Sequence, residues 1–177
     1  MRIITGKYKG RHFEVPRSFS ARPTTDFAKE NLFNVLQAYI DFSEGPTALD
    51  LFSGTGSITL ELVSRGCSRV VSVELDAKHN RLIKQFVDKL QDDAAFTVRA
   101  DVFQYLAKCR EQFDFIFADP PYVLPQIAEL PDLVMSRGLL KEDGVFVLEH
   151  GKQYDFSDHP SFVEHRSYGS VNFSFFK

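Results

Sequence analysis

The sequence of 177 residues lacks several features that would define its class at once. It has no tryptophan, and its two cysteines, Cys67 and Cys109, stand alone. That spacing excludes a disulfide framework and a paired zinc site. No apolar run approaches the roughly 20 residues that cross a bilayer, and the basic start has no apolar segment typical of a secretory signal. We therefore expect a cytoplasmic protein, with no membrane partner and no bound metal.

The sequence also lacks internal repeats, low-complexity tracts and linkers. Its length is typical of one domain, and its 44% hydrophobic and 25% charged residues are ordinary for a globular protein. We expect residues 23–177 to form a single domain. Residues 1–22 form a basic extension, in which two β-prone runs, 2–5 and 11–15, flank a glycine-containing turn and predict a small β-hairpin.

The net charge of −3 hides an asymmetry along the chain. Residues 1–22 sum to +5, so the remaining 155 residues sum to −8. A difference of this size indicates an anionic partner at the basic end. A solvated, frayed terminus is the alternative. The basic residues available for such a partner are Arg2, Lys7, Lys9, Arg11, Arg17 and Arg22.

From residue 47 onward, apolar strands alternate with amphipathic helices, which predicts a parallel sheet covered on both faces. The last two strands have no helix between them, so one of them should run antiparallel. The expected α/β fold has seven strands, at 48–52, 69–74, 96–100, 113–118, 144–149, 162–166 and 171–176. The expected helices lie at 27–40, 57–64, 77–90, 102–108 and within 125–136, the first capped by Thr24 or Thr25.

Four acidic residues stand at or just past the ends of successive strands: Asp50, Glu74, Asp101 and Asp119. Ligands of open α/β sheets bind outside the carboxyl ends of the strands, so these acids predict a site at one edge. Asp is also a common turn residue and helix N-cap, and for Asp101 alone that structural interpretation is favoured.

The segment Asp50-Leu51-Phe52-Ser53-Gly54-Thr55-Gly56 places two glycines at a strand-to-helix turn, where the backbone can approach a ligand closely. Thr59 stands where a dinucleotide fingerprint has a third small residue. The Asp50 carboxylate suits a ligand with positive charge and no phosphate, such as S-adenosylmethionine. Glu74 is spaced to bind ribose hydroxyls, and Asp101 could accept from the adenine amine.

Asp119-Pro120-Pro121-Tyr122 follows an apolar strand directly. The two prolines make a rigid turn, which presents a carboxylate, a backbone carbonyl and an aromatic ring together. Asp119 and the Pro120 carbonyl could accept both hydrogens of a nucleobase amine and so localise its lone pair. Tyr122 could stack on the extruded base. A strand terminator with a core tyrosine is the alternative.

These two segments resemble the cofactor loop and catalytic motif of Rossmann-like class I amino-methyltransferases. Residues 2–11 and Arg22-Pro23-Thr24-Thr25-Asp26 further resemble the RsmD family, whose members methylate a guanine N2 in 16S ribosomal RNA. The resemblance implies that Thr24 and Thr25 border the methionine end of the cofactor. It also implies that the basic hairpin touches RNA. Tyr122 is shared with adenine-modifying relatives, so base identity stays open.

The expected function is therefore methyl transfer from S-adenosylmethionine to guanine N2, in free 16S ribosomal RNA or in an assembling small subunit, by a monomer. A DNA adenine-N6 methyltransferase, a nicotinamide-dependent oxidoreductase and a non-catalytic RNA-binding assembly factor stay open as alternatives. The expected catalytic residues are Asp119, Pro120 and Tyr122. The expected cofactor-binding residues are Thr24, Thr25, Asp50, Phe52, Gly54, Gly56, Glu74, Asp101 and Asp119, and the expected RNA-binding residues are Arg2, Lys7, Lys9, Arg11 and Arg22.

Overall fold

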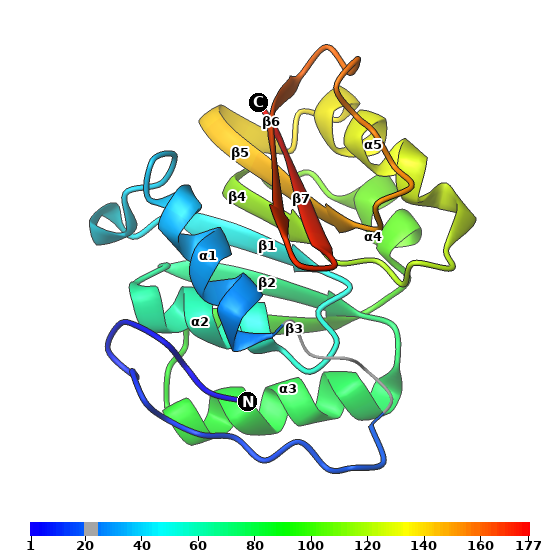
Figure 1. The fold of residues 1–177 in the computed structure, drawn as a ribbon. Coiled ribbons are helices and arrows are strands. Elements are labelled where there is room, and N and C mark those ends of the chain that lie inside the picture. Colours follow the sequence, from blue (N-terminus) through cyan, green and yellow to red (C-terminus); the bar gives the residue numbers. More distant parts are fainter. Residues whose placement is uncertain (20–24) are drawn as a thin grey trace.

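A β-sheet runs through the centre of the molecule, and the computed structural model describes residues 1–19 and 25–177 around it (Figure 1). The strands are β1 (Thr47–Leu51), β2 (Arg69–Glu74), β3 (Ala95–Arg99), β4 (Phe113–Ala118), β5 (Leu140–His150), β6 (Phe162–Tyr168) and β7 (Val171–Phe176). The α-helices are α1 (Asp26–Leu36), α2 (Ser57–Arg65), α3 (Ala77–Leu90), α4 (Val102–Lys108) and α5 (Leu130–Ser136). Two short 3₁₀ helices are η1 (Phe42–Glu44) and η2 (Pro125–Glu129).

The strand order is β3-β2-β1-β4-β5-β7-β6. The first five strands in this order are parallel, and β7 runs antiparallel to both of its neighbours, β5 and β6. This confirms the predicted seven-stranded, mostly parallel α/β sheet with one antiparallel strand near the C-terminus. No helix within the described part of the chain is long and apolar enough to cross a bilayer.

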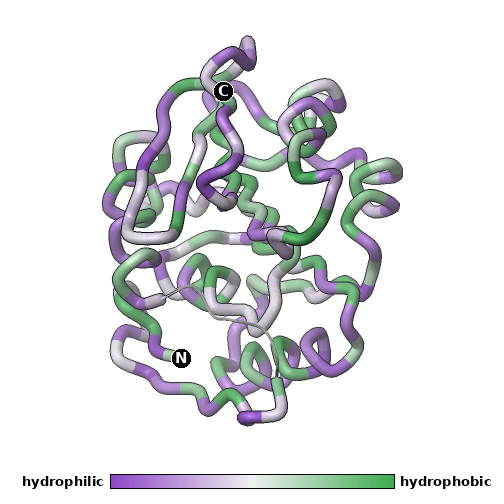
Figure 2. Tube along the Cα trace, turned by 45° about the vertical axis from the view of Figure 1, so that its right-hand side comes forward, coloured by the Kyte–Doolittle hydropathy of each residue, from purple (hydrophilic) through white to green (hydrophobic). Residues whose placement is uncertain are grey.

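Helices cover both faces of the sheet. In β4, Phe115 and Phe117 pack into the layer of α1, α2 and α3, while Ile116 and Ala118 pack into the layer of α4 and α5. Burial on both faces explains why the strand reads as a continuous apolar run. Hydrophobic and hydrophilic residues alternate along the turns of the outer helices (Figure 2), because one side of such a helix faces the sheet and the other faces solvent. In α2, residues 57–64 are all buried.

From residue 25 onward, three predicted elements differ from the structure by more than two residues or in their division. Helix α1 ends at Leu36 rather than near residue 40, because the chain continues in turns. The helix expected within 125–136 is divided into η2 and α5, and each piece begins with a proline in its first turn. Strand β5 begins at Leu140 rather than at 144. Its register against β4 shifts before Val145, and Asp143 lies there at φ 63°, so a bulge conceals the first part of the strand.

The N-terminal segment forms a hairpin-like loop, although only one antiparallel bridge, between Arg2 and His12, replaces the two predicted strands. Figure 1 shows this loop beside α2 and α3. Ile3 and Phe13 are buried in the same core as those helices, and the Phe13 ring lies 4.9 Å from that of Phe86. Apolar packing therefore holds the N-terminal segment against the domain, whereas its composition indicates only that the segment is basic.

A buried ion network joins this segment to the domain. The Glu61 carboxylate on α2 accepts from the backbone N–H groups of Ile4 and Thr5, at 2.8 and 3.0 Å. It also lies 2.9 Å from Arg65 Nε and 3.7 Å from Lys29 Nζ. Lys29 donates to the Arg2 carbonyl oxygen at 2.7 Å. The network therefore ties α1, α2 and the N-terminal loop together, with the Lys29 and Glu61 side chains almost entirely buried.

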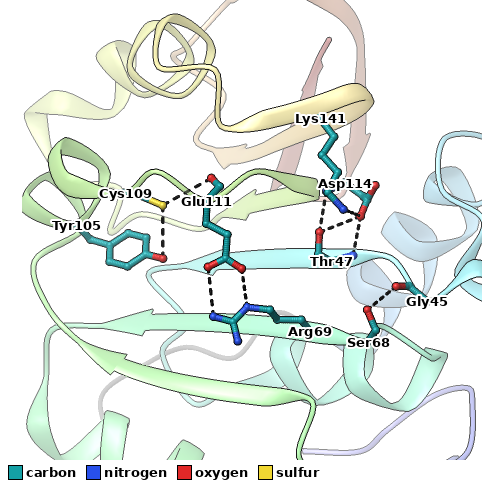
Figure 3. Close-up of polar contacts among 9 residues, drawn as sticks. All are labelled: Gly45, Thr47, Ser68, Arg69, Tyr105, Cys109, Glu111, Asp114 and Lys141. Carbon is teal, nitrogen blue, oxygen red and sulfur yellow. Dashed lines mark hydrogen bonds and ion pairs between the residues drawn. The ribbon is translucent and has the colours of Figure 1, made fainter.

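Polar contacts also connect the starts of the strands, at the amino edge of the sheet (Figure 3). Asp114 on β4 accepts from the Thr47 backbone N–H at 2.7 Å and pairs with Lys141 on β5 at 2.8 Å. Arg69 on β2 pairs with Glu111, which lies just before β4, at 2.5 Å. These contacts align the starts of β1, β4 and β5, and so help to set where their opposite ends fall.

Removing the Glu61 carboxylate should destabilise the fold strongly, because it leaves a buried Lys29 charge uncompensated. We expect Glu61→Ala to lower the free energy of unfolding by about 3–5 kcal/mol, measured by urea denaturation at neutral pH. The control is Glu30→Ala, which removes an exposed carboxylate from α1. Equal stabilities of the two variants would contradict this role for the network.

Candidate active site at the carboxyl edge of the sheet

The ends of the central strands lie level with one another. Leu51, the last residue of β1, pairs with Val73 of β2 and with Ala118 of β4, and Ala118 pairs with Leu148 of β5. The acidic residues at these ends therefore gather at one edge, as the sequence predicts. They are, in sheet order, Asp101, Glu74, Asp50, Asp119 and also Glu149.

Asp50 is buried within this edge, with 2% of its surface exposed. Burial raises its pKa to about 7, a nearby Glu74 adds to the rise, and hydrogen bonds oppose it. One of these bonds comes from the Thr59 hydroxyl, which donates to Asp50 Oδ2 at 2.5 Å. Thr59 stands where a dinucleotide fingerprint has a third small residue, and in this structure its hydroxyl is a hydrogen-bond donor to Asp50.

The glycine loop connects β1 to α2. Gly54 and Gly56 both have positive φ, at 55° and 82°, and Phe52 adopts φ 58° between them and the strand. A Cβ at Gly56 would come within 3.0 Å of Ile83. Glycine is therefore required at Gly56 for backbone conformation and for packing.

Glu74 holds the glycine loop in place. Its carboxylate accepts from the backbone N–H of Gly54 and from that of Asp76, each at 2.8 Å. Asp101 caps α4, because it accepts from the Gln104 N–H at 3.0 Å. The structural interpretation of Asp101 as an N-cap is thus confirmed, and its contact with a ligand stays a prediction.

Asp119 follows β4 directly, and its backbone N–H donates to the Leu51 carbonyl oxygen at 3.3 Å. Burial raises the pKa of its carboxyl group well above the usual range, and the nearby Glu149 and Asp50 raise it further. Pro120 is buried, whereas Tyr122 is 42% exposed and donates through its hydroxyl to Glu149 Oε1 at 3.2 Å. The rigid turn therefore presents the expected carboxylate and aromatic ring at the edge.

Glu149 is a functional candidate that the sequence reasoning missed. It is only 5% exposed, and it stands near the end of β5. The signal was available, since Glu149 closes the predicted strand at 144–149 just as Glu74 closes its own. The apolar run that precedes Glu149 indicates a strand residue, and this local pattern hides its position as a fifth acid at the strand ends.

The expected cofactor-binding and RNA-binding residues near the N-terminus differ in their hydrogen-bond and ion-pair partners. Thr25 caps α1 by accepting from the Ala28 N–H at 3.2 Å, whereas Thr24 and Arg22 fall outside the described residues. Two of the expected RNA-binding cations have acidic partners: Arg2 pairs with Asp26 at 3.4 Å and Lys7 with Asp92 at 2.5 Å. Arg11 donates to the Lys89 carbonyl oxygen at 3.1 Å. Lys9 is exposed on the same loop.

The carboxyl edge has an unbalanced charge. Within residues 1–19 and 25–177, no lysine or arginine forms an ion pair with Asp50, Glu74 or Asp119, whereas the acids of the amino edge are paired. Asp50 is the most buried of these three acids, and an unpaired buried carboxyl group ionises at a high cost unless a cation binds beside it. The donor set therefore fits a cationic ligand such as the sulfonium and ammonium groups of S-adenosylmethionine. The described residues contain no group of three or more side chains that could hold a metal.

Known proteins resemble the chain over most or all of its length. The family described as conserved hypothetical protein 95 matches residues 1–177. YlbH of Bacillus subtilis strain 168 is 36% identical over 159 residues, which cover 88% of this chain and 85% of YlbH. Ribosomal RNA small subunit methyltransferase D of Escherichia coli K12 is 33% identical over 150 residues, which cover 84% of this chain and 74% of that protein.

Solved structures share the whole fold. A hypothetical protein from Thermus thermophilus superposes with a TM-score of 0.86 at 30% identity, covering 100% of this chain and 99% of that one. A T. thermophilus 16S rRNA N2 G1207 methyltransferase, solved with AdoMet and guanosine, superposes with a TM-score of 0.71 at 23% identity. That match covers 90% of this chain and 44% of the other, and shows a shared fold.

The fold and its carboxyl edge define a Rossmann-like class I methyltransferase. The match over all 177 residues and the similarity to the E. coli enzyme then narrow the class. The chain belongs to the RsmD family of ribosomal RNA methyltransferases.

The raised pKa of Asp50 makes the ligand-free protein less stable as pH rises. The group is neutral in the fold up to a pKa of about 7 but ionises near 3.8 when unfolded. Its stabilising contribution is therefore complete at low pH, falls as pH rises between these values, and is lost above the higher one. Between about pH 5 and about pH 8, wild type should lose about 2–3 kcal/mol more stability than Asp50→Asn. Urea denaturation at both pH values measures this difference, and parallel losses would contradict it.

Proposed function

We propose that the protein transfers the methyl group of S-adenosylmethionine to the exocyclic N2 amine of a guanine in 16S ribosomal RNA. The observation that carries this proposal is the position of Asp119-Pro120-Pro121-Tyr122 at the end of β4, directly beside the glycine loop after β1. An acceptor motif and a cofactor loop at one edge bring two reactants together, which is a large part of catalysis for a methyl transfer.

The cofactor supplies an electrophilic methyl group on a sulfonium centre. The chain offers the buried Asp50 carboxyl group and the loop of Gly54 and Gly56 for binding its charged and polar parts. We expect Glu74, at the end of the next strand, to accept from ribose hydroxyls, and Asp101 to accept from the adenine amine. Phe52 and Thr25 complete the proposed cofactor-binding set, together with Thr24.

The chain activates the amine by orienting it. The lone pair of a nucleobase amine is delocalised into the ring, so the amine is a weak nucleophile. Asp119 and the Pro120 carbonyl oxygen accept its two hydrogens, which localises the lone pair, while Tyr122 stacks on the base. When N2 gains the methyl group it loses one proton. The Asp119 carboxyl group takes that proton, directly or through water, because the positive sulfonium of the bound cofactor favours its ionised form before the transfer.

The N-terminal loop is the proposed RNA contact. Its charge is smaller than the composition indicates, because Asp26 and Asp92 pair with Arg2 and Lys7. Lys9, on the exposed turn of the loop, and Arg11 are the cations that we expect to contribute most to phosphate binding.

The DNA adenine alternative shares the acceptor motif, but the relatives of this chain are named as ribosomal RNA methyltransferases, which favours an RNA substrate. A nicotinamide-dependent oxidoreductase is disfavoured because Thr59 replaces the third small residue of the dinucleotide fingerprint, and because the Asp50 carboxyl group would lie near a negatively charged pyrophosphate. A non-catalytic assembly factor would not need the acceptor motif.

Tritiated methyl transfer to naked 16S ribosomal RNA, to assembled 30S subunits and to duplex DNA distinguishes these possibilities. Label on DNA alone, or on no substrate, would overturn the proposal.

Within the same assay, Asp119→Ala should reduce methyl transfer to background, because neither the amine hydrogens nor the released proton would find the carboxylate. Its affinity for S-adenosylmethionine, measured by equilibrium dialysis, should fall far less than its rate of methyl transfer, because Asp50, Glu74 and the glycine loop are unchanged. Asp158→Ala, which removes an exposed acid from the loop after β5, is the matched control and should keep full activity. Full activity of Asp119→Ala would exclude the proposed role.

A further inference from the structure

Glu149 lies next to the acceptor motif, although no step described so far uses it. Ala118 of β4 pairs with Leu148 of β5, so the following residues, Asp119 and Glu149, are neighbours across parallel strands. The pKa of Asp119 reflects this proximity. Burial is the main cause of its rise, and the charge of Glu149 is the next largest. The Glu149 side chain is therefore close to the amine that Asp119 is proposed to bind.

Tyr122 fixes the direction of the Glu149 carboxyl group. The tyrosine hydroxyl donates to Glu149 Oε1 at 3.2 Å, from a ring that is 42% exposed. A carboxylate oxygen has two lone pairs, so it can accept from the hydroxyl and from a ligand together. The carboxylate is thus linked to the same ring that is proposed to stack on the base.

The bases differ at the atom next to the reactive amine. In guanine, the ring nitrogen N1 carries a hydrogen, so N1 and N2 together present a row of donors. In adenine, the ring nitrogen beside the amine is an acceptor with a lone pair. A carboxylate next to the Asp119 acceptor complements the first pattern and repels the second, and extruded bases are read by such contacts to their Watson–Crick edge.

We infer that Glu149 selects guanine by accepting a hydrogen bond from N1–H, while Asp119 and the Pro120 carbonyl oxygen accept from N2. This inference rests on the proposed function and names the residue that sets its base specificity. It also explains the paired acids, because a pocket that accepts three hydrogens from one base edge needs acceptors on adjacent strands.

The test replaces the target guanine by 2-aminopurine, which keeps the amine but has a lone pair instead of a hydrogen at N1. Mass spectrometry of 16S ribosomal RNA methylated by wild type first locates the target nucleotide. A synthetic RNA carrying either base at that nucleotide is then the substrate, and kcat/KM for methyl transfer is measured for both. A site that hydrogen-bonds its substrate rejects an analogue lacking the donor strongly, so wild type should prefer guanine at least ~100-fold.

The variant Glu149→Gln has the same shape, but its amide group can donate to the 2-aminopurine N1. We expect it to lower the guanine preference by at least ~10-fold. Glu142→Gln makes the same change on an exposed residue of β5 and should leave the preference unchanged. An unchanged preference in Glu149→Gln would overturn the inference.

The inference can be overturned even where Glu149→Gln does not fold. Equal kcat/KM of wild type for guanine and 2-aminopurine would by itself contradict it. Failure of the proposed function gives a different result. In that case wild type would form no N2-methylguanosine in ribosomal RNA, whereas failure of the inference alone leaves that product present.

Discussion

The burial of several carboxyl groups at one sheet edge is the constraint on which the rest of this structure depends. Asp50 and Glu149 lie on β1 and β5, and Asp119 directly follows β4 between them. Asp50 and Asp119 have raised pKa values because burial disfavours their charged forms. Such an arrangement costs stability in the ligand-free protein. Buried acids with raised pKa values are typical of functional sites, where a ligand compensates for their burial. A cationic cofactor would stabilise their ionised forms, and the hydrogen-bond donors of a base would satisfy their oxygens.

The remaining polar network has the opposite character. Acids at the amino edge have basic partners, as Asp114 has in Lys141 and Glu111 in Arg69. The buried Glu61 combines two cations and two backbone N–H groups. These contacts hold the strand starts and the N-terminal loop, so the strand ends can carry buried acids without losing their alignment. Stability and binding are thus assigned to opposite edges of the same sheet.

The sequence predicted most of this arrangement, for identifiable reasons. Strands β2, β4 and β7 and helices α3 and α4 have the predicted bounds, because apolar periodicity and turn residues are local signals. The start of β5 was missed because a bulge at Asp143 interrupts the pattern. The packing of Ile3 and Phe13 against the domain depends on contacts far apart in the chain, which no local pattern reveals. The gathering of the acids was predicted because parallel strands bring their carboxyl ends together, whereas the pairing of Tyr122 with Glu149 required coordinates.

If the buried carboxyl groups bind a positively charged ligand, proton release on binding is the most direct measurement of it. Isothermal titration of the protein with S-adenosylmethionine, in buffers of different ionisation enthalpy at about pH 6.5, counts the protons exchanged. Binding a cation favours the ionised form of Asp50, whose pKa is about 7 in the ligand-free protein. We expect net proton release that diminishes as pH rises above that value. Binding without proton release, or with proton uptake, would contradict it.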